Sequence, residues 1–571
     1  METKDFVVRF AGEGGQGVVT AAAALAQAAA QVGYHVLTFS TFPSQIRGGP
    51  TWTQVRVSTA PILSSGDFLN VLVAFNKEAY DTHRGEVNEG GVVIYNSGDF
   101  QLESDGQSFG LPFADLARST GNLRAANFVV VGALAHLVDM PHEYLAEFNR
   151  KRYTRGRPND QEIIESNNKA LLLGREGAAE SGFSLGTLPP AIKPEMDQVL
   201  INGNQALSMG AMAAGLNCFI GYPISPATSI LEFMEANLVG EGRFAYQASS
   251  ELESINSVVG AGYAGKKAMT ATAGPGFTLM GEGLGFAWMA EIPCVVVDVQ
   301  RGGPATGLPT KTEQSDFLTA LHPAHGDMEL PIIAPGDVEE CFFAAIKALN
   351  WAERYQGPVI LLSEHNLSER AQNIPRPDLT SVTVENRQVH NDGNGYLRYE
   401  AATLSPMPIP GGPGSYVANA SEHDPYGDTT HRPDRHIQMT HRRFDKINLL
   451  VEDEYESENA NQPVVLLPWG GTKGPAREAY NRLMEMGEEL GWFYTMNLNP
   501  LPPTMLEELK QKELVIVPEL NYLGQFSSFL RSKGINAESI TQYTGLPFKV
   551  YDLTQRIFER NKAHTEKKAR V

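Results

Sequence analysis

A serine hydroxyl held between two prolines is the first feature of this sequence that could do chemistry. The segment FIGYPISPATS, residues 219–229, places Ser225 between Pro223 and Pro226. Proline fixes φ, lacks an N–H donor and favours an extended residue before it, so the two prolines hold Ser225 in one orientation. Taken alone, the segment predicts a strand-to-helix turn with Ser225 near the helix N-cap.

The chain downstream supplies an acid and a cation that could complete a binding site. Glu251 stands at the start of a helix rich in small residues, and Arg301 begins the loop RGGPATGLPTKTEQ after an apolar strand. In a parallel sheet, loops that leave the C-terminal ends of strands meet at one edge, where ligands bind. An acid, hydroxyls and Arg301 at that edge predict a ligand site. The alternative for Glu251 is structural, because a glutamate near a helix N-terminus is stabilised by the helix dipole.

A glycine-rich turn near the N-terminus could bind phosphate. In GEGGQG, Gly12, Gly14 and Gly17 match G-x-G-x-x-G between a strand and a helix, and Gly15 lies inside the motif. Glycines let a phosphate approach the backbone at the positive end of a helix. The next strand region, HVLTFSTFPSQIRGG, lacks the acid that binds a dinucleotide ribose, which disfavours nicotinamide dinucleotide. Another phosphate-bearing ligand and a purely structural turn remain equal alternatives, and Arg47 faces either an anion or solvent.

Alternating strands and helices must position these groups. The first block begins with a strand, a glycine turn and a helix in DFVVRFAGEGGQGVVTAAAALAQAAAQVG, and HVLTFS, NVLVAFN and GGVVIYN follow as short buried strands. Apolar strands separated by helix-length segments predict an α/β fold with a parallel sheet. Strands such as CVVVDVQ and PVILLSE predict a second α/β block, and the segment from QPVVLLPWGG to GLPFKVYDL predicts a third.

Shifts in composition predict the domain boundaries. A charged helix and the Pro-rich linker GTLPPAIKPE end the first block. Residues 371–460 are poor in periodicity and rich in Gly, Pro, Asp and His, which predicts an ordered extended crossover. The predicted domains are residues 1–185, residues 195–370, the crossover 371–460, residues 461–560 and a basic tail, 561–571.

Charge and composition exclude several classes of protein. The 571 residues include 66 acidic and 46 basic side chains, and this net charge of −20 argues against nucleic acid or an anionic membrane as the main partner. The sequence has no run of about 18 apolar residues and no signal-peptide core, so we expect a cytoplasmic protein. Cys218, Cys294 and Cys341 are too few and too far apart for an iron–sulfur cluster or a thiolate zinc site. We therefore expect no metal site in this chain, and any redox centre must lie elsewhere.

Long collinear segments resemble one known family. GNQALSMGAMAAG with GYPISPATSI, ELESINSVVGAGYAGKKAMTATAGPGFTLM and QRGGPATGLPTKTEQSD look like the α-subunit of 2-oxoacid:ferredoxin oxidoreductases, which are thiamine diphosphate enzymes. GEGGQGVV with RGGPTW resembles the γ-subunit, and WGGTKGPAREA, VPELNYLGQF and YTGLPF resemble the transketolase C-terminal-like domain. The resemblance implies a γ–α fusion: a multidomain α/β chain with a Rossmann-like γ domain, a thiamine-diphosphate-binding pyrimidine-type domain and a transketolase C-terminal-like domain.

The resemblance implies roles for the residues of the predicted site. Glu251 matches the catalytic glutamate, whose carboxyl group hydrogen-bonds pyrimidine N1′ and promotes loss of a proton from the 4′-amino group. Glu253 is the competing candidate. Ser225, where the family commonly has threonine, should bind the carboxylate or keto oxygen of a 2-oxoacid, and Arg301 should bind a carboxylate. The further cofactor contacts that it implies are Tyr222, Pro223, Ile224, Thr310, Lys311 and Gln314.

Motifs that the chain lacks imply a partner. No GDG motif followed by the usual asparagine is present, so the half-site for Mg²⁺ and the diphosphate is missing. The resemblance therefore implies a separate β-subunit that carries Mg²⁺ and a [4Fe–4S] cluster, in an (αβ)₂ assembly that shares thiamine diphosphate. It also implies ferredoxin as the electron carrier and coenzyme A as a co-substrate, with its phosphates bound by the glycine-rich N-terminal domain.

The reaction that the resemblance implies is reversible oxidative decarboxylation of 2-oxoglutarate to succinyl-CoA and CO₂, with electrons passed to ferredoxin. Pyruvate and branched-chain 2-oxoacids are alternative substrates, because the partner builds part of the pocket. Two other classes of function remain open. A nicotinamide-dependent dehydrogenase would explain GEGGQG, and a non-catalytic scaffold subunit would explain the missing half-site.

Overall fold

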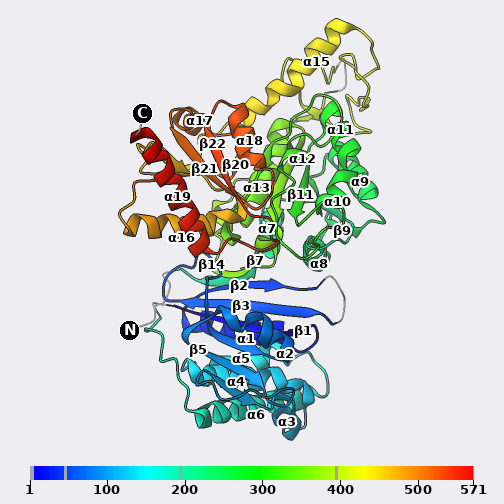
Figure 1. Ribbon diagram of the computed structural model, residues 1–571. Helices are drawn as coiled ribbons and strands as arrows, with labels where there is room; N and C mark the ends of the chain where they lie inside the picture. The colour runs from blue at the N-terminus through cyan, green and yellow to red at the C-terminus, as the bar shows by residue number, and fades with distance from the viewer. Residues whose placement is uncertain (1–4, 44–47, 192–195, 393–395, 570–571) are drawn as a thin grey trace. The chain divides into compact units, whose positions relative to one another are not determined.

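The computed structural model describes residues 5–43, 48–191, 196–392 and 396–569 (Figure 1). Arg47, the expected anion contact, lies outside the described residues. The chain divides into two compact units. Their bounds are Met1–Ile201 with Arg370–Arg376 for the first unit, and Asn202–Glu369 with Pro377–Val571 for the second.

The first unit is built on a mixed sheet with the strand order β6-β5-β4-β1-β3-β2-β14-β7. These strands are β1 (Asp5–Glu13), β2 (His35–Thr41), β3 (Pro50–Ser58), β4 (Leu69–Ala74), β5 (Val87–Asn96), β6 (Ser108–Leu111), β7 (Gln198–Asn202) and β14 (Ala371–Pro375). Its helices are α1 (Val18–Val32), α2 (Lys77–His83), α3 (Phe113–Ser119), α4 (Ala126–Leu137), α5 (His142–Tyr153) and α6 (Asp160–Ser181). Strands β1, β4, β5 and β6 are parallel, as the sequence predicts.

The prediction of a parallel sheet is wrong at β2 and β3. Strand β3 lies between β1 and β2 and is antiparallel to both. Its residues Thr51, Thr53, Val55 and Val57 share one buried face, the period-two pattern of a strand. The sequence analysis missed this strand, because RGGPTW was read only as part of a glycine loop. A short connection suits the antiparallel pair, whereas a parallel neighbour needs a crossover.

The second unit contains a seven-stranded sheet with the order β20-β12-β13-β11-β10-β8-β9. These strands are β8 (Cys218–Gly221), β9 (Phe244–Gln247), β10 (Ala268–Thr272), β11 (Cys294–Gln300), β12 (Ile332–Ile333), β13 (Pro358–Glu364) and β20 (Asn497–Asn499). All neighbours are parallel except β20, which is antiparallel to β12. The helices are α7 (Gly203–Ala213), α8 (Thr228–Asn237), α9 (Glu251–Tyr263), α10 (Gly274–Leu279), α11 (Gly281–Ala290), α12 (Phe317–Leu321), α13 (Val338–Tyr355) and α14 (His365–Ser368).

A five-stranded sheet completes the second unit, with the order β17-β19-β18-β21-β22. Its elements are β17 (Glu456–Glu458), β18 (Val464–Leu466), β19 (Gly491–Tyr494), β21 (Leu514–Glu519), β22 (Ala537–Thr541), α16 (Lys473–Glu485), α17 (Pro503–Lys510), α18 (Gln525–Ser532) and α19 (Val550–Ala569). Alternate residues of β18 face opposite cores: Val464 and Leu466 pack with α16 and α19, which lie side by side in Figure 1. Val465 instead joins α17, α18 and the seven-stranded sheet in one core.

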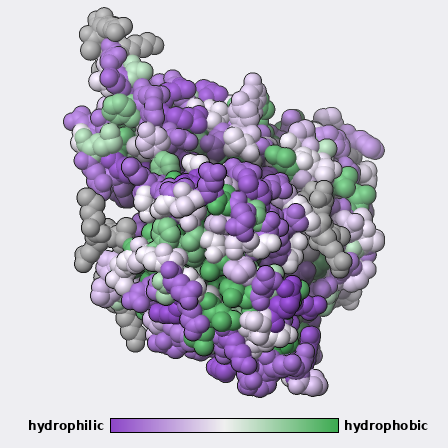
Figure 2. Space-filling view, turned by 60° about the horizontal axis from the view of Figure 1, so that its bottom comes forward, coloured by the Kyte–Doolittle hydropathy of each residue, from purple (hydrophilic) through white to green (hydrophobic). Residues whose placement is uncertain are grey.

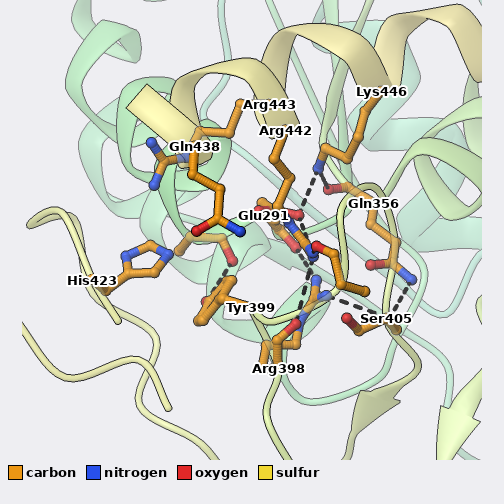
Figure 3. Close-up of polar contacts among 12 residues, drawn as sticks. Glu291, Gln356, Arg398, Tyr399, Ser405, His423, Gln438, Arg442, Arg443 and Lys446 are labelled. Atoms are coloured by element: carbon orange, nitrogen blue, oxygen red, sulfur yellow. Dashed lines mark hydrogen bonds and ion pairs between the residues drawn. The ribbon is translucent and has the colours of Figure 1, made fainter. Parts of the chain in front are cut away.

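The crossover carries little regular structure and is anchored by buried charges. It contains β15 (Val389–His390), β16 (Met407–Pro408) and α15 (Pro433–Asp445). Figure 3 shows Arg442 and Lys446 directed at Glu291, which follows α11. Arg442 Nε lies 2.8 Å from Glu291 Oε1, and Lys446 Nζ lies 3.0 Å from Oε2. Arg398 donates to the Glu291 carbonyl oxygen at 3.1 Å. These contacts hold the crossover against the end of α11.

Figure 2 shows hydrophilic residues over much of one face, with hydrophobic residues in smaller patches between them. Within the residues that the structure describes, no helix combines the length and apolar character that crossing a bilayer requires.

Candidate functional site

The YPISP segment forms the loop between β8 and α8. Pro223 and Ile224 are half-buried, whereas Tyr222 and Ser225 are exposed. Arg301 Nη1 donates to the Ser225 carbonyl oxygen at 2.7 Å, and Asn204 Nδ2 donates to the Pro226 carbonyl oxygen at 2.9 Å. The loop is therefore held by polar side chains from two other segments, which leaves the Ser225 hydroxyl facing outward.

Glu251 is the first residue of α9 and is buried, with 7% of its surface exposed. Its carboxylate makes no hydrogen bond or ion pair to another described residue. The carboxylate packs against Gly276 at the start of α10. A Cβ atom at position 276 would lie 2.5 Å from Glu251 Oε1 and 2.2 Å from Thr272 Oγ1. Glycine at this position is therefore required by the close approach of the Glu251 carboxylate.

Glu253, the competing candidate, is fully engaged in local contacts. Its Oε2 accepts hydrogen bonds from the Ser249 backbone N–H and hydroxyl, both at 2.6 Å, and Oε1 accepts one from the Tyr246 hydroxyl at 3.1 Å. Hydrogen bonds from Ser249 and Tyr246 lower the pKa of Glu253. An ionised carboxylate that caps its own helix has a structural role, and no ligand is needed to account for it. The geometry therefore favours Glu251 over Glu253 as the carboxyl group that meets a ligand.

A cavity of about 870 Å³ has Arg301 on its wall, whereas Glu251 and Ser225 are not among the residues that line it. Gly274 and Pro275 of the glycine turn line it, as do Tyr522 and Tyr543 from the C-terminal part of the unit. Arg301 is 7% exposed and donates from Nη2 to the Thr306 carbonyl oxygen at 3.3 Å, in addition to its Ser225 contact. Burial lowers the pKa of Arg301, and the charge of Asp316 opposes that shift. Among the described residues that line this cavity, Arg301 is the only basic one.

The other predicted loop residues have different surroundings. Gln314 is fully buried: its Nε2 donates to the Trp469 carbonyl oxygen at 2.9 Å, and its Oε1 accepts the Leu520 N–H at 3.0 Å. Gln314 thus ties the loop to the C-terminal sheet. Burial lowers the pKa of the Lys311 amine. Thr310 lies beside it in the same loop, between the isolated bridge at Leu308 and the buried Gln314.

Two aspartates that the sequence analysis missed lie next to Arg301. Asp298 is a fully buried residue of β11, and burial, with the charge of Asp316, raises its pKa well above the ordinary value. Asp316 lines the cavity, and burial, with the charge of Glu313, raises its pKa to about 6. The aspartate inside the apolar strand CVVVDVQ could have been recognised from the sequence as a functional candidate, because an unpaired acid is rarely buried without a function.

The glycine-rich turn of the first unit borders a separate cavity of about 410 Å³. Gly14, Gly15 and Gly17 line it at the N-terminus of α1, whereas Gly12 lies in β1 and does not. The Gly14 N–H donates to the Gly49 carbonyl oxygen at 3.2 Å, so the GEGGQG and RGGP segments meet. The arrangement presents backbone N–H groups and a helix N-terminus to this cavity.

The three cysteines are buried and unbridged. In the described part of the chain, no group of three or more His, Cys, Asp or Glu side chains is arranged to hold a metal ion.

Comparison with known proteins identifies the family. Residues 7–177 match the family model described as "Pyruvate ferredoxin/flavodoxin oxidoreductase", and residues 209–442 match "Pyruvate flavodoxin/ferredoxin oxidoreductase, thiamine diP-bdg". The "2-oxoglutarate oxidoreductase subunit KorA" of Mycobacterium tuberculosis is 32% identical to this chain, over 95% of the chain and 90% of that protein. The chain belongs to the 2-oxoacid:ferredoxin oxidoreductase family.

Two further members of the 2-oxoacid:ferredoxin oxidoreductase family show how far the likeness extends. Subunit alpha of 2-oxoacid:ferredoxin oxidoreductase 1 from Aeropyrum pernix is 30% identical, over 97% of both chains. A solved structure, the 2-oxoglutarate:ferredoxin oxidoreductase of Magnetococcus marinus with 2-oxoglutarate, coenzyme A and succinyl-CoA bound, is 36% identical. It superposes with a TM-score of 0.92 over 98% of this chain and 100% of that one. The chain is thus an α-type subunit of this family, with a multidomain α/β fold.

Proposed function

We propose that this chain is the large subunit of a coenzyme A-dependent 2-oxoglutarate:ferredoxin oxidoreductase, which converts 2-oxoglutarate to succinyl-CoA and CO₂. The observation that carries this proposal is the buried, unpartnered Glu251 carboxylate against Gly276, beside a cavity with Arg301 on its wall. The substrates bound in the Magnetococcus marinus enzyme support the choice of 2-oxoglutarate. Pyruvate and branched-chain 2-oxoacids are the alternative substrates.

The residues present fit thiamine diphosphate. A carboxyl group that is buried, unpartnered and bordered by a glycine suits a hydrogen bond to a heteroaromatic nitrogen. Thiamine diphosphate, when bound, supplies a carbanion that attacks the keto carbon of the 2-oxoacid. Glu251 would hold the proton at pyrimidine N1′. Ser225 would donate a hydrogen bond to a substrate oxygen, and Arg301 would pair with a substrate carboxylate. Tyr222, Pro223 and Ile224 would border the cofactor.

A partner subunit is part of this proposal. Strand β9 is at the end of its sheet, and its residues Phe244 and Tyr246 are 49% and 48% exposed. Leu252, beside Glu251, is 51% exposed. Exposed apolar side chains on an unpaired strand edge are typical of a surface that another protein covers. The proposed occupant is a β-subunit that carries Mg²⁺, the diphosphate half-site and a [4Fe–4S] cluster, and that passes electrons to ferredoxin from an (αβ)₂ assembly.

The glycine-rich cavity of the first unit is proposed to bind the phosphates of coenzyme A. Gly14, Gly15 and Gly17 line this cavity at the N-terminus of α1, where negative charge is stabilised. In this proposal, residues 1–185 bind coenzyme A and residues 195–370 bind the pyrimidine of thiamine diphosphate. Residues 461–560 hold the loop that contains Gln314.

Anaerobic reduction of a viologen dye by this chain, purified with its co-expressed β-subunit, tests the proposal. Reduction is expected with 2-oxoglutarate in preference to pyruvate, and only when coenzyme A is present for sustained turnover. Turnover with another 2-oxoacid alone would overturn the substrate. No turnover with any 2-oxoacid, from a complex shown to hold its cluster and thiamine diphosphate, would favour a non-catalytic scaffold.

Replacing Ser225 with alanine is expected to raise KM for 2-oxoglutarate or lower kcat by about 10-fold, because a hydrogen bond to a charged group contributes about 1.5 kcal/mol. The hydroxyl is exposed, and the loop is held through the backbone carbonyl of Ser225, so thermal unfolding should not change. Steady-state kinetics and calorimetry of the complex measure both. Unchanged kinetics would contradict the proposed role of Ser225.

Replacing Gly276 with alanine is expected to lower kcat by about 10-fold or more, because the new methyl group must displace the Glu251 carboxylate or Thr272, and overpacking costs about 1–3 kcal/mol. Gly260→Ala is the matched control, since a Cβ atom there meets no neighbour within 4 Å. Kinetics of the two variants, compared at equal content of folded complex, measure the difference. Equal activity would show that the contact between Gly276 and Glu251 does not matter for turnover.

A further inference from the structure

Two further carboxyl groups, those of Asp298 and Asp316, lie near the glycine turn that borders Glu251. Thr272, which packs beside Glu251 at Gly276, is the register neighbour of Asp298 across β10 and β11. Asp298 and Gln300 share one face of β11, and Gln300 Oε1 accepts the Asp316 N–H at 3.1 Å. This bond holds Asp316 at the same edge of the sheet as Asp298. A row of polar groups therefore runs along the C-terminal ends of two parallel strands.

The glycine turn lies between the carboxyl groups of Glu251 and Asp316. A Cβ atom at Gly274 would lie 2.8 Å from Asp316 Oδ2 and 3.2 Å from Oδ1. The Asp316 carboxylate thus packs on Gly274 as the Glu251 carboxylate packs on Gly276. Two glycines in one turn leave room for one carboxyl group each. This placement puts Asp316 in the same cavity wall as Arg301, close to the group proposed to act on the cofactor.

Several buried polar atoms here have no partner among the described residues. They are both carboxyl oxygens of Asp298, Oδ2 of Asp316, Oγ of Ser315 and Nε of Arg301. Arg301, Ser315 and Asp316 line the 870 Å³ cavity, and Arg301 is 93% buried, since 7% of its surface is exposed. Buried polar groups are almost always hydrogen-bonded in folded proteins, so a cluster of unpaired ones indicates a place where a ligand is bound.

Electrostatics distinguish the two acids. Burial and the charge of Asp316 raise the pKa of the fully buried Asp298 well above its ordinary value. Asp316 instead lines the cavity, where the charge of Arg301 opposes the rise of its pKa. The other charged group near Asp316 is Glu313, whose charge adds to the effect of burial and raises the pKa of Asp316 to about 6. Tyr522 and Tyr543 also line the cavity, and Glu251 lies across the glycine turn.

We propose that Asp316 accepts the proton released by the thiol of coenzyme A in this cavity. The inference rests on the proposed function. The S–H bond would break and the proton would go to Asp316 Oδ1. The sulfur electron pair would form the thioester bond to the acyl carbon that decarboxylation leaves, as the bond between that carbon and the cofactor breaks. Overall, a 2-oxoglutarate dianion and a thiol give the succinyl thioester, CO₂, two electrons for a low-potential iron–sulfur protein and one proton, which Asp316 returns to solvent.

Asp316 suits this role better than the neighbouring acids. Its Oδ2 is out of solvent contact, so Oδ1 is the oxygen that reaches the cavity. A base with a pKa close to the working pH transfers protons most efficiently. Glu251 is assigned to the cofactor, and Glu313 already accepts a hydrogen bond from the Gly303 backbone N–H. The volume of the cavity suits a thiol arm, since ligand pockets of about 300–1,000 Å³ enclose molecules of that size.

The test compares Asp316→Asn, Asp298→Asn and Glu313→Gln in the complex with the β-subunit, measured from pH 5 to 8. In the wild-type complex the coenzyme A-dependent rate should fall as pH drops through about 6, because Asp316 must be ionised to accept a proton. Asp316→Asn should lower kcat by about 10²-fold or more and remove this acid limb, while KM for 2-oxoglutarate changes little. Glu313→Gln should keep the limb but move it to lower pH, because the charge of Glu313 raises the pKa of Asp316. Asp298→Asn should leave the limb in place.

Infrared difference spectra of the same complexes across this pH range supply a readout besides activity. A carboxyl band that titrates with the acid limb should be present in the wild type and absent from Asp316→Asn. An unchanged kcat and acid limb in Asp316→Asn would overturn the proposal. If that variant does not assemble, a Glu313→Gln complex with an undisplaced limb would overturn it. A wild-type complex that releases no CO₂ from any 2-oxoacid would instead refute the proposed function, whereas the infrared titration would still report the Asp316 carboxyl group.

Discussion

Replacing Glu251 with glutamine lowers kcat of the reconstituted complex by about 10²- to 10⁴-fold, the range expected when a positioned acid–base group is lost. Glutamine is nearly the same size and keeps the packing against Gly276, but it cannot share a proton with pyrimidine N1′. The Glu251 carboxylate makes no hydrogen bond to another described residue, so its replacement breaks no contact of the fold. Anaerobic viologen reduction measures the loss, and calorimetry verifies that the complex is folded.

Glu253→Gln is the matched control, two residues along the same helix. Its carboxylate accepts hydrogen bonds from Ser249 at Oε2 and from Tyr246 at Oε1. A glutamine can still accept the Ser249 bonds through its amide oxygen and donate from its NH₂ group to the Tyr246 hydroxyl oxygen. This variant should therefore retain activity within a few-fold of the wild type. A large loss in Glu253→Gln with full activity in Glu251→Gln would reverse the assignment. Loss in neither would remove the acid–base role and favour a scaffold function.

Replacing Glu291 with glutamine is the second prediction with a large effect, here on stability. The variant leaves Arg442 and Lys446 buried without their counter-ion, and removing one partner of a buried ion pair costs about 3–5 kcal/mol. Both cations lie in the crossover, which should detach from the end of α11 (Figure 3). Urea unfolding followed by tryptophan fluorescence measures the loss, because Trp288 lies in α11 and contacts Phe444 of the crossover edge to face.

The matched control is Glu282→Gln, an exposed acid in α11 whose side chain is 78% accessible. It should unfold like the wild type, since exposed ion pairs contribute little. The effect at Glu291 also has a defined pH dependence. Burial raises the pKa of Glu291, but Lys446, Arg442 and Arg398 outweigh burial and hold the pKa below its ordinary value. Ionised Glu291 contributes fully to the free energy of unfolding above the pKa of unfolded glutamate, and this contribution is lost as pH falls through the pKa of Glu291 in the folded protein. Equal stability of both variants at neutral pH would contradict the ion-pair anchor.

Most of the local structure was predictable from the sequence. The apolar segments CVVVDVQ and PVILLSE are strands β11 and β13, and the GEGGQG turn precedes α1 as expected. These predictions succeed because burial on both faces of a parallel sheet requires continuous apolar strands. Strand β3 was missed because glycines next to it suggested a loop, although its alternation was visible in PTWTQVRVS.

Long-range pairing decided the rest of the site. The sequence could name Glu251, Ser225 and Arg301 through spacing and a family resemblance, because each follows a strand or begins a helix. It could not choose Glu251 over Glu253, since that choice depends on which carboxylate is occupied by Ser249 and which packs on Gly276. Gln314 likewise matched a motif, and only the fold shows its amide bound to the backbone of the C-terminal sheet.

The sequence by itself determined many of the strands and helices, the net negative charge, the glycine turns and the family. The tertiary structure alone decided that Asp298 and Asp316, 18 positions apart, lie close enough for the charge of one to raise the pKa of the other, and that Glu291 binds Arg442 and Lys446 of the crossover. The physical reason is that periodicity and turn residues report forces within a few residues. Charge pairing and desolvation depend on which distant segments the closed core brings together.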